Sequence, residues 1–264
     1  MKIGFLTLEF PNSKAPASGG LGTSLVNLSK ALKNEGVEVI IFMYGQDRDE
    51  VFQENGIEIH MIKARNFGKL TWYKYRKFVQ NYVNTQIKAK NIDLIEAPDW
   101  TGITAFMNLN APLVIRFHGS DAYFCKLENR QQKLKNFLFE KMGVRNAQGY
   151  IAPTDFAGTL SASIFRISKP VKTIHYGLQL TDFTNEHPRQ FEKGLILHIG
   201  TIIRKKGVFE LPEIFRKVHA QFPGARMVLI GPDANDHETG SRSTWELIEK
   251  SIDNSLKPFI TYLG

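Results

Sequence analysis

The sequence predicts an α/β protein with two doubly wound parallel-sheet domains, the second incomplete, and three observations predict it. Short apolar runs alternate with stretches of helical periodicity, as in βαβ units. A polar segment over residues 181–193, which includes Pro188, interrupts the alternation. The alternation then resumes, and 264 residues suffice for two domains. We therefore expect an N-terminal domain over 1–180, a linker over 181–193 and a partial C-terminal domain over 194–264.

The elements of the first domain follow from the periodicity of the apolar residues. Gly36 stands where a helix C-cap is expected, after a helix that the apolar residues 25–32 carry. Continuous apolar runs predict strands over 2–8, 37–43, 57–62, 92–96, 113–117, 150–152 and 171–175. Helical periodicity predicts further helices starting at 97–100, spanning 70–90 and 123–145, and following residue 155.

The second domain repeats the pattern. We expect strands over 195–199, 226–230 and 259–263, and helices over 207–221 and 243–252. The apolar run 195–199 is typical of a strand covered on both faces. Ser243 and Glu246 form the sequence of a capping box. The chain stops directly after its last strand, whose face needs a further helix, so we expect part of this domain to be missing.

Composition indicates a globular protein with an anionic partner. The formal net charge is +8 and the isoelectric point about 9.4. A single cysteine, Cys125, excludes an internal disulfide and fits a reducing compartment. The apolar run after Met1 is too short for a signal peptide, and no segment approaches the length of a bilayer span. We therefore expect a soluble, cytoplasmic protein, peripheral on the inner face of the membrane at most.

The stretch 63–90 combines cations with aromatic residues and contains no acid. This combination suits an anionic membrane surface and would also suit single-stranded nucleic acid. A third interpretation is a helix whose aromatics face the core and whose lysines face water. We favour the membrane over nucleic acid, which we do not expect as a partner. The residues concerned are Lys63, Arg65, Lys69, Trp72, Tyr73, Lys74, Tyr75, Arg76, Lys77, Phe78, Tyr82, Lys88 and Lys90.

Three consecutive cations, Arg204, Lys205 and Lys206, follow the predicted strand 195–199 and precede a helix. Open α/β sheets bind ligands at the carboxyl ends of their strands. A helix N-terminus with cations beside it favours an anion such as phosphate. The alternative is a solvated turn without a ligand.

The second glycine-rich turn contains Gly19, Gly20 and Gly22. It does not match the dinucleotide fingerprint, because it comes ten residues after the strand and has Leu25 in place of the third glycine. It is not a P-loop either, because no Gly-Lys-Ser/Thr follows. What remains is a turn without side chains, which a ligand can approach closely, or a tight structural turn.

Several polar residues follow predicted strands in the first domain. His118 comes after the strand 113–117 and before Gly119-Ser120-Asp121. Glu96 and Asp99 end the strand before it, where they could position an acceptor hydroxyl; Asp99 could equally cap a helix.

The acids between residues 233 and 238, in the second domain, lack the regular spacing of metal ligands, so we expect a surface loop there and no metal.

Five motifs in this order resemble the family-four retaining glycosyltransferases of GT-B fold. The likeness covers the whole chain. The motifs are Ser18-Gly19-Gly20-Leu21-Gly22, Pro98-Asp99-Trp100, His118-Gly119-Ser120-Asp121, Ile174-His175-Tyr176-Gly177-Leu178-Gln179 and the run from Gly200 to Gly207.

The resemblance implies a fold of two Rossmann-like domains and transfer of a sugar from a nucleotide-sugar donor, with retention and without metal or cofactor. It implies a cell-surface glycan or lipid-linked acceptor. Gly19, Gly20 and Gly22 would lie near the donor diphosphate, His118 would contact the transferred sugar, and Lys206 would neutralise the phosphates. The family's arginine after the strand glycine is Thr201 here, so Arg204 or Lys205 would compensate. Glu96, Asp99 and Asp121 would position acceptor and sugar.

Two departures from the family pattern leave an alternative open. Tyr176 and Gln179 replace the asparagine and aspartate of one motif. The family's glutamate pair, which holds the donor, lies beyond Gly264. The alternative is a non-catalytic fragment that binds a nucleotide-sugar or an acceptor.

Overall fold

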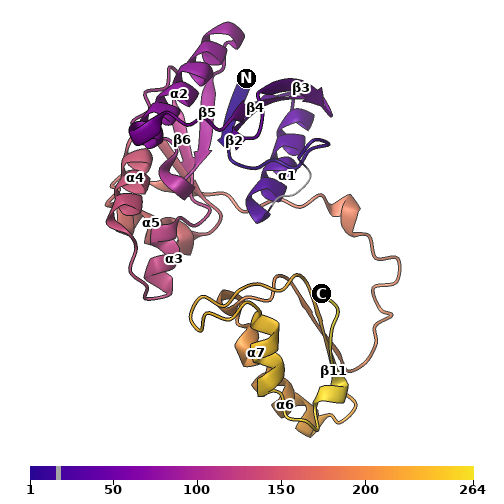
Figure 1. Ribbon diagram of the computed structural model, residues 1–264. Helices are drawn as coiled ribbons and strands as arrows, with labels where there is room; N and C mark the ends of the chain where they lie inside the picture. The colour runs from indigo at the N-terminus through magenta and orange to yellow at the C-terminus, as the bar shows by residue number, and fades with distance from the viewer. Residues whose placement is uncertain (16–18) are drawn as a thin grey trace. The chain divides into compact units, whose positions relative to one another are not determined.

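The computed structural model describes residues 1–15 and 19–264. They fall into two compact units, Met1–Phe183 and Thr184–Gly264 (Figure 1). Each unit is an α/β layer structure with its own sheet and its own buried cluster. A 3-10 turn, Leu180–Phe183, ends the first unit, and no helix or strand follows until Leu195.

The first unit is built on an eight-stranded sheet in the order β3-β4-β2-β1-β5-β6-β7-β8. Its strands are β1 (Lys2–Thr7), β2 (Glu38–Gln46), β3 (Glu50–Glu54), β4 (Ile57–Lys63), β5 (Leu94–Pro98), β6 (Leu113–Arg116), β7 (Gly149–Ala152) and β8 (Val171–Thr173). Its helices are α1 (Gly20–Asn34), α2 (Thr71–Lys90), α3 (Asp121–Leu127), α4 (Leu134–Arg145) and α5 (Asp155–Phe165), with 3-10 turns at Gly68–Leu70 and Trp100–Gly102.

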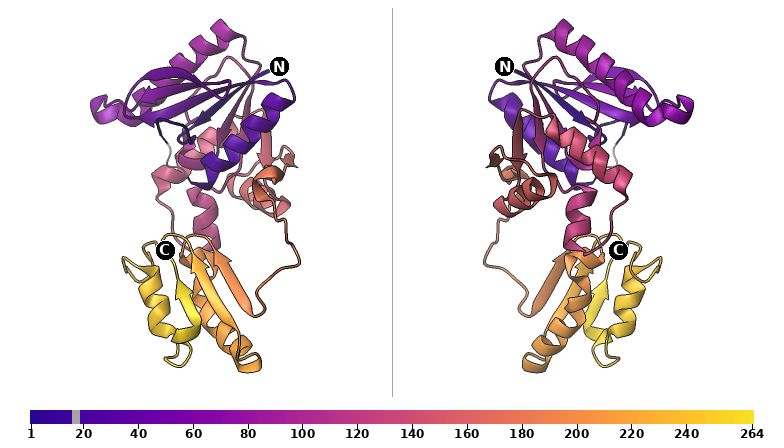
Figure 2. Two further views of the ribbon diagram at one scale, coloured as in Figure 1. Left: turned by 90° about the vertical axis from the view of Figure 1, so that its right-hand side faces the viewer. Right: turned by 90° about the vertical axis from the view of Figure 1, so that its left-hand side faces the viewer.

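Helices cover the two faces of this sheet unequally. Leu25 of α1 packs with Phe5 and Ile41 on one face. The other face carries the larger cluster, to which α2, α4 and α5 all contribute. Figure 2 shows α1 in front of the sheet in one view and the other helices in front in the opposite view. Because Ile95 and Ile115 belong to the larger cluster, their strand neighbours point toward the α1 face.

One strand corrects the expectation of a purely parallel sheet. β3 pairs antiparallel with β4 at the sheet edge. Asn55 and Gly56 connect them, with φ of 52° and 70°. Positive φ at both positions is the signature of a two-residue type I′ hairpin, for which Asn-Gly is the preferred sequence. The Asn55-Gly56 turn is visible in the sequence, but the charged residues in 50–54 hide the strand before it.

The predicted helix 123–145 is two helices, α3 and α4. The segment 128–133 separates them, and Asn129 there has a φ of 50°. The reversal lets the Glu140 carboxylate of α4 accept hydrogen bonds from the backbone N–H groups of Asp121 and Ala122, at 3.0 and 3.1 Å. These donors are in the first turn of α3 and have no partner within that helix, so a side chain of α4 supplies their hydrogen-bond acceptor.

The helix predicted to start at 97–100 is only a short 3-10 turn. Thr101 and Gly102 both have positive φ, 63° and 55°, which a helix does not allow. Arg76 of α2 donates to the carbonyls of both residues, so the turn's acceptors are satisfied without a helix. Gly102 also touches the Phe139 backbone, where an added Cβ would lie 2.4 Å away.

The second unit is a three-stranded parallel sheet, β11-β10-β9, with two helices. Ser243 accepts a hydrogen bond from the Glu246 backbone N–H at 2.9 Å, which confirms the first half of the predicted capping box. The Ser243 N–H donates to the Ser241 hydroxyl at 3.2 Å instead of to Glu246. The elements are β9 (Leu195–Ile199), α6 (Leu211–Gln221), β10 (Arg226–Ile230), α7 (Thr244–Ser251) and β11 (Ile260–Tyr262), with 3-10 turns at Arg204–Lys206, Val208–Glu210 and Lys257–Phe259.

The prediction that strand 195–199 is covered on both faces is wrong for the described residues. Alternate side chains of β9 are exposed, 51% at Leu197 and 72% at Ile199. Both helices pack with Met227 and Leu229 on one face of β10. Continuous apolar runs are found in doubly covered strands, but here only one face is covered.

Candidate functional site

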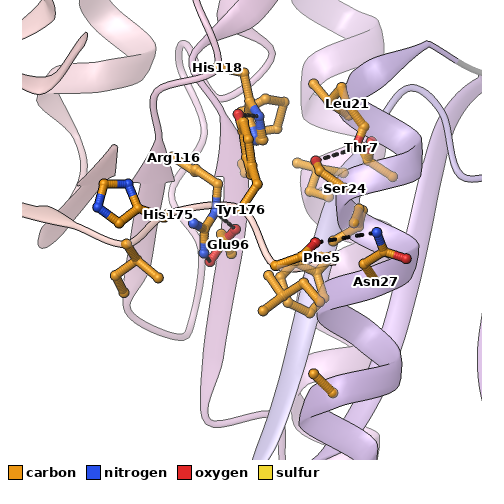
Figure 3. Close-up of a pocket in the computed structure, with 18 residues that line it drawn as sticks. Phe5, Thr7, Leu21, Ser24, Asn27, Glu96, Arg116, His118, His175 and Tyr176 are labelled. Atoms are coloured by element: carbon orange, nitrogen blue, oxygen red, sulfur yellow. Dashed lines mark hydrogen bonds and ion pairs between the residues drawn. The ribbon is translucent and has the colours of Figure 1, made fainter. Parts of the chain in front are cut away.

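A cavity of about 210 Å³ opens on the α1 face of the first unit (Figure 3). α1 forms one wall, β1, β5 and β6 form the floor, and the segment after β8 forms the other wall. The lining residues are Phe5, Leu6, Thr7, Leu21, Ser24, Leu25, Asn27, Leu28, Ala31, Glu96, Ala97, Pro98, Arg116, His118, Ile174, His175, Tyr176 and Gly177. The cavity therefore brings together residues from four of the motifs singled out in the sequence, through Leu21, Pro98, His118 and the residues 174–177.

His118 lies in this cavity beside Tyr176. The His118 Nδ1 and the Tyr176 hydroxyl are 2.7 Å apart, and the two rings are stacked with centroids 5.8 Å apart. Burial, with a smaller contribution from Arg116, lowers the pKa of His118 to about 4, so the ring is neutral near pH 7. Burial raises the pKa of Tyr176 to about 12, so its hydroxyl keeps its proton.

These two states allow the Tyr176 hydroxyl to donate the hydrogen bond to the His118 ring. A neutral imidazole has one N–H donor and one acceptor nitrogen. If the protonated Tyr176 hydroxyl donates to Nδ1, the His118 ring proton is on Nε2. His118 then offers one uncharged N–H donor, which suits a sugar hydroxyl. Sequence reasoning named Tyr176 only as a departure from the family pattern, because its distance from His118 along the chain hides the contact.

Asp99 lies beneath the cavity rather than in its lining. It is 1% exposed, and its Oδ1 accepts a hydrogen bond from the His118 backbone N–H at 2.9 Å. Burial raises the pKa of this carboxyl to about 7. Its Oδ2 is buried and makes no hydrogen bond with the described residues. The side chain makes no helix-capping bond, so it holds the start of the His118 loop instead.

Glu96 and Arg116 form a buried ion pair on the cavity floor. Arg116 Nε and Nη2 donate to the two carboxylate oxygens at 2.7 and 3.1 Å. Bidentate pairing of this kind satisfies both charges. Arg116 was not singled out from the sequence. A signal existed, because a charged residue in the apolar run 113–117, two before His118, shares its face.

Asp121 lies away from the cavity lining. Its carboxylate pairs with Arg130 at 3.2 Å, in the first turn of α3. The Ser120 side chain caps the same helix by accepting from the Tyr123 backbone N–H at 3.1 Å. In the motif His118-Gly119-Ser120-Asp121, His118 therefore lines the cavity, while Ser120 and Asp121 belong to the start of α3.

The glycine-rich turn opens α1, and its amides bind a carboxylate of the chain itself. Gly19 N–H and Gly22 N–H each donate to Glu9 at 3.1 Å. Gly20 is the first residue of α1, and Leu21 beside it lines the cavity. Ser18 lies outside the described residues. Glu9 was missed by sequence reasoning, since nothing in its neighbours marks it as an amide acceptor.

In the second unit, the cationic turn follows β9 as predicted. Arg204 donates to both carboxylate oxygens of Asp236, at 2.9 and 2.8 Å, and lies over the Phe209 ring. This pairing holds the pKa of Asp236 well below its usual range. Lys205 and Lys206 are exposed.

Lys206 lies beside the carboxyl ends of β9 and β10, where both strands end in a glycine. Gly200 and Gly231 end β9 and β10 with φ of 142° and 137°, values that favour glycine. A Cβ on Gly231 would lie 2.3 Å from the Gly200 carbonyl oxygen, and a Cβ on Gly200 would lie 2.8 Å from the Lys206 Nζ. The carboxyl ends of β9 and β10 are therefore bare backbone at Gly200 and Gly231, with an ammonium group beside them.

The acids at 233–238 have structural partners. Asp233 accepts from the backbone N–H groups of Thr244 and Trp245 at 3.0 Å, at the start of α7. Asp236 is paired with Arg204. Across residues 1–15 and 19–264, no group of three or more His, Cys, Asp or Glu side chains is arranged to hold a metal ion.

The basic-aromatic stretch 63–90 is α2 and the segment before it. Half of its eight cations are engaged within the fold, and the aromatics at the start of α2 pack with Phe106 and Phe139. The engaged cations are Arg65 with Asp49, Arg76 with backbone carbonyls, Lys77 with the Phe106 carbonyl, and Lys90 with Glu58. None of the described helices is long and apolar enough to span a bilayer.

Comparisons with known proteins agree with this geometry. A family model described as Glycosyltransferase Family 4 matches residues 18–182. A sucrose-phosphate synthase from Thermosynechococcus elongatus is similar in structure, with a TM-score of 0.67 and 18% identity over 100% of this chain and 70% of that one. A trehalose-6-phosphate synthase has a TM-score of 0.63 and 9% identity over 100% and 74%.

The catalytic domain of starch synthase IV from Arabidopsis thaliana, bound to ADP and acarbose, has a TM-score of 0.58 and 14% identity over 99% of this chain and 73% of that one. At these identities the likeness shows a shared fold. No curated protein matches the chain.

Proposed function

The chain belongs to glycosyltransferase family 4 and has the GT-B fold of a glycosyltransferase, and we propose that it takes its sugar from a nucleotide-sugar donor. The acceptor in this proposal is a cell-surface glycan or a lipid-linked glycan at the inner face of the membrane. Transfer proceeds with retention of the anomeric configuration and without metal or cofactor.

The observation that carries the proposal is the bare sheet edge beside Lys206. Transfer from a nucleotide-sugar requires stabilisation of a departing diphosphate. Backbone without side chains lets phosphate oxygens approach closely, and a nearby ammonium neutralises their charge without a metal. Two structural neighbours support a nucleotide ligand, since one is described as bound to ADP and another, an α-glucosyltransferase, as a complex with UDP.

His118 has the complementary task in the proposal. A neutral Nε2–H donor would bind a hydroxyl of the transferred sugar in a cavity that excludes part of the solvent. With the departing phosphate as base, the acceptor attacks from the leaving-group face, and the pair of carboxylates used in glycoside hydrolysis is not needed. The paired Glu96 carboxylate is consistent with this, since Arg116 occupies both of its oxygens.

Calorimetric titration with UDP, GDP and ADP tests the donor site. We expect one nucleotide to bind and the Lys206→Ala variant to bind it at least tenfold more weakly, a loss of about 1.4 kcal/mol. Lys250→Ala is the matched control, because Lys250 is an exposed lysine of the same unit. No binding of any nucleotide, or equal loss in both variants, would contradict the proposal.

Product analysis tests the reaction itself. With the nucleotide that binds and its sugar donors, we expect product of retained anomeric configuration and equal turnover with and without a chelator. We expect His118→Ala to lose turnover while nucleotide affinity stays unchanged, because His118 would contact the sugar and not the base. Loss of turnover on chelation would contradict the metal-independent part of the proposal.

A further inference from the structure

Helix α4 exposes apolar side chains on its outer face. Leu134, Leu138 and Met142 are 71%, 46% and 37% exposed. They are spaced four residues apart and therefore form one stripe along the helix. The buried residues Gly143 and Val144 lie on the opposite side. A helix on the surface of a globular unit normally presents polar residues to water, so this stripe is unusual.

Cations flank the stripe, and no exposed acid accompanies them. The single acid of α4 is Glu140, which is 2% exposed and bound to the N-terminus of α3. None of the four cations forms an ion pair with another described residue. We call the stripe and its cations the α4 surface; it consists of Lys133, Leu134, Lys135, Leu138, Lys141, Met142 and Arg145.

The start of α2 extends the α4 surface. The Trp72 ring stacks on Phe139 of α4 with centroids 5.1 Å apart, and the Lys135 ammonium lies over the same Trp72 ring. Leu70 and Tyr73, on either side along the chain, are 48% and 37% exposed. Both helices therefore contribute exposed apolar side chains next to uncompensated lysines.

We propose that the α4 surface docks on the surface of an anionic lipid bilayer. Apolar side chains of an amphipathic helix enter the boundary between headgroups and acyl chains, while lysine and arginine meet the lipid phosphates. The α4 surface offers both on one face. A symmetric contact with a second copy of this chain would place these cations against one another, which opposes association.

The membrane contact of this proposal centres on α4, next to the start of the stretch 63–90 in which the sequence suggested it. In α2 and the segment before it, half of the cations are engaged within the fold, and Trp72 packs on Phe139. The cations of α4 form no ion pair with a described residue, although Lys135 and Lys141 lie over aromatic rings. The inference goes beyond the proposed function and does not depend on it, because vesicle binding requires neither donor nor acceptor.

Sedimentation of the whole chain with vesicles tests the inference. We expect binding to vesicles of equal parts phosphatidylglycerol and phosphatidylcholine, weakening as salt is raised, and no binding to phosphatidylcholine alone. Leu138→Ser with Met142→Ser should weaken binding at least tenfold, and Lys135→Glu with Lys141→Glu likewise. All four side chains are on the outer side of α4, so the fold should persist, which thermal unfolding checks.

Matched controls distinguish binding through the α4 surface from non-specific binding to vesicles. Lys30→Glu with Lys88→Glu makes the same change of charge elsewhere on this unit, at exposed lysines of α1 and α2. Phe156→Ser removes another exposed apolar side chain, 62% exposed, from α5. Both controls should bind vesicles as the wild type does.

Three outcomes would overturn the inference. The first is no sedimentation of the wild type with anionic vesicles. The second is equal weakening in the controls, which would mean attraction by net charge alone. The third is a dimer in light scattering that the Leu138→Ser, Met142→Ser variant dissociates, which would make the α4 surface an interface between copies.

Discussion

Each unit carries an arginine–carboxylate pair near its candidate site, and the two pairs differ in their surroundings. Arg116 with Glu96 is buried, with side chains 7% and 10% exposed. Arg204 with Asp236 has an equally close bidentate geometry, but the arginine is 39% exposed. The difference in burial indicates that the two pairs have different structural roles. The first closes a cavity floor, and the second braces a turn whose neighbouring lysines face solvent.

The same contrast extends to the groups beside each pair. In the first unit, His118 is held neutral and hydrogen-bonded, so the site suits uncharged hydroxyls. In the second unit, Lys206 lies over bare backbone, which suits an anion. Under the proposed function, the first unit positions sugar and acceptor while the second receives the diphosphate. The predictions below test this division, from the largest expected effect to the smallest.

Removing each arginine should separate the two pairs. Arg116→Met leaves the Glu96 carboxylate buried without its partner, and we expect the first unit to lose about 3–5 kcal/mol of stability. Arg204→Met should cost the second unit only about 1 kcal/mol, because that pair is partly solvated and Asp236 keeps its bonds from Thr239. Hydrogen exchange read separately for each unit measures both values. Equal losses would mean that burial does not distinguish the pairs.

Asp99 should make the stability of the first unit depend on pH. Its pKa is raised from 3.8 to about 7, so the contribution of this carboxyl is largest below pH 4 and is lost as pH rises through 7. Between pH 5 and 8 the loss amounts to about 2–3 kcal/mol. His118 acts in the opposite sense, because its pKa is lowered and its penalty grows as pH falls below 6.5.

The Asp99→Asn variant isolates the two opposing effects. Without the Asp99 carboxyl, its loss of stability with rising pH disappears and the opposite effect of His118 remains, so the variant's free energy of unfolding should rise from pH 5 to pH 8 relative to that of the wild type. Denaturant unfolding at a series of pH values gives the difference between the two proteins. If that difference is the same at pH 5 and pH 8, Asp99 is not the titrating group.

Element order was largely predictable, because apolar periodicity reports which side of an element is buried. The errors have local causes. The edge strand Glu50–Glu54 is too polar to read as a strand, and the break between α3 and α4 contains no glycine or proline. The exposed face of β9 could not be foreseen, because the same apolar run fits a strand that helices cover on one face or on both.

The candidate site was predictable only where a motif marks the chain. His118 and the cationic turn were found because each follows an apolar run that ends a strand. Tyr176 and Glu9 were missed as partners, because each acts through a contact with residues distant in sequence. Arg116 lay inside a strand already assigned to packing, although alternation places its side chain on the same face as His118.

The hydroxyl of Tyr176 provides a test of how His118 is held. Tyr176→Phe keeps the stacked ring but removes the hydrogen bond to Nδ1, and we expect a loss of about 0.5–1.5 kcal/mol. Nitrogen NMR of labelled histidine should show the Nδ1 resonance of His118 moving toward that of an imidazole without a hydrogen bond. Tyr123→Phe is the control, since its hydroxyl makes no hydrogen bond with the described residues. An unmoved resonance would exclude Tyr176 as the donor.

Glu9 gives the smallest effect and bears directly on the contrast between the units. Its carboxylate accepts from the amides of Gly19 and Gly22, so the anion position at the start of α1 is already filled from within the chain. Glu9→Gln removes a charge at a helix N-terminus, and we expect the first unit to lose about 0.5–1 kcal/mol. Amide exchange at Gly19 and Gly22 should become faster.

The same variant also tests whether the glycine-rich turn receives phosphate, as the resemblance to the family implies. A carboxylate near a bound diphosphate repels it, so Glu9→Gln should raise the affinity for the bound nucleotide about two- to fivefold. Lys206→Ala in the same background should still abolish most of that affinity, because the ammonium of the second unit is the main anion contact in the proposal. If Glu9→Gln speeds amide exchange but leaves nucleotide affinity unchanged, the turn's amides serve only to hold α1, and the diphosphate depends on the second unit alone.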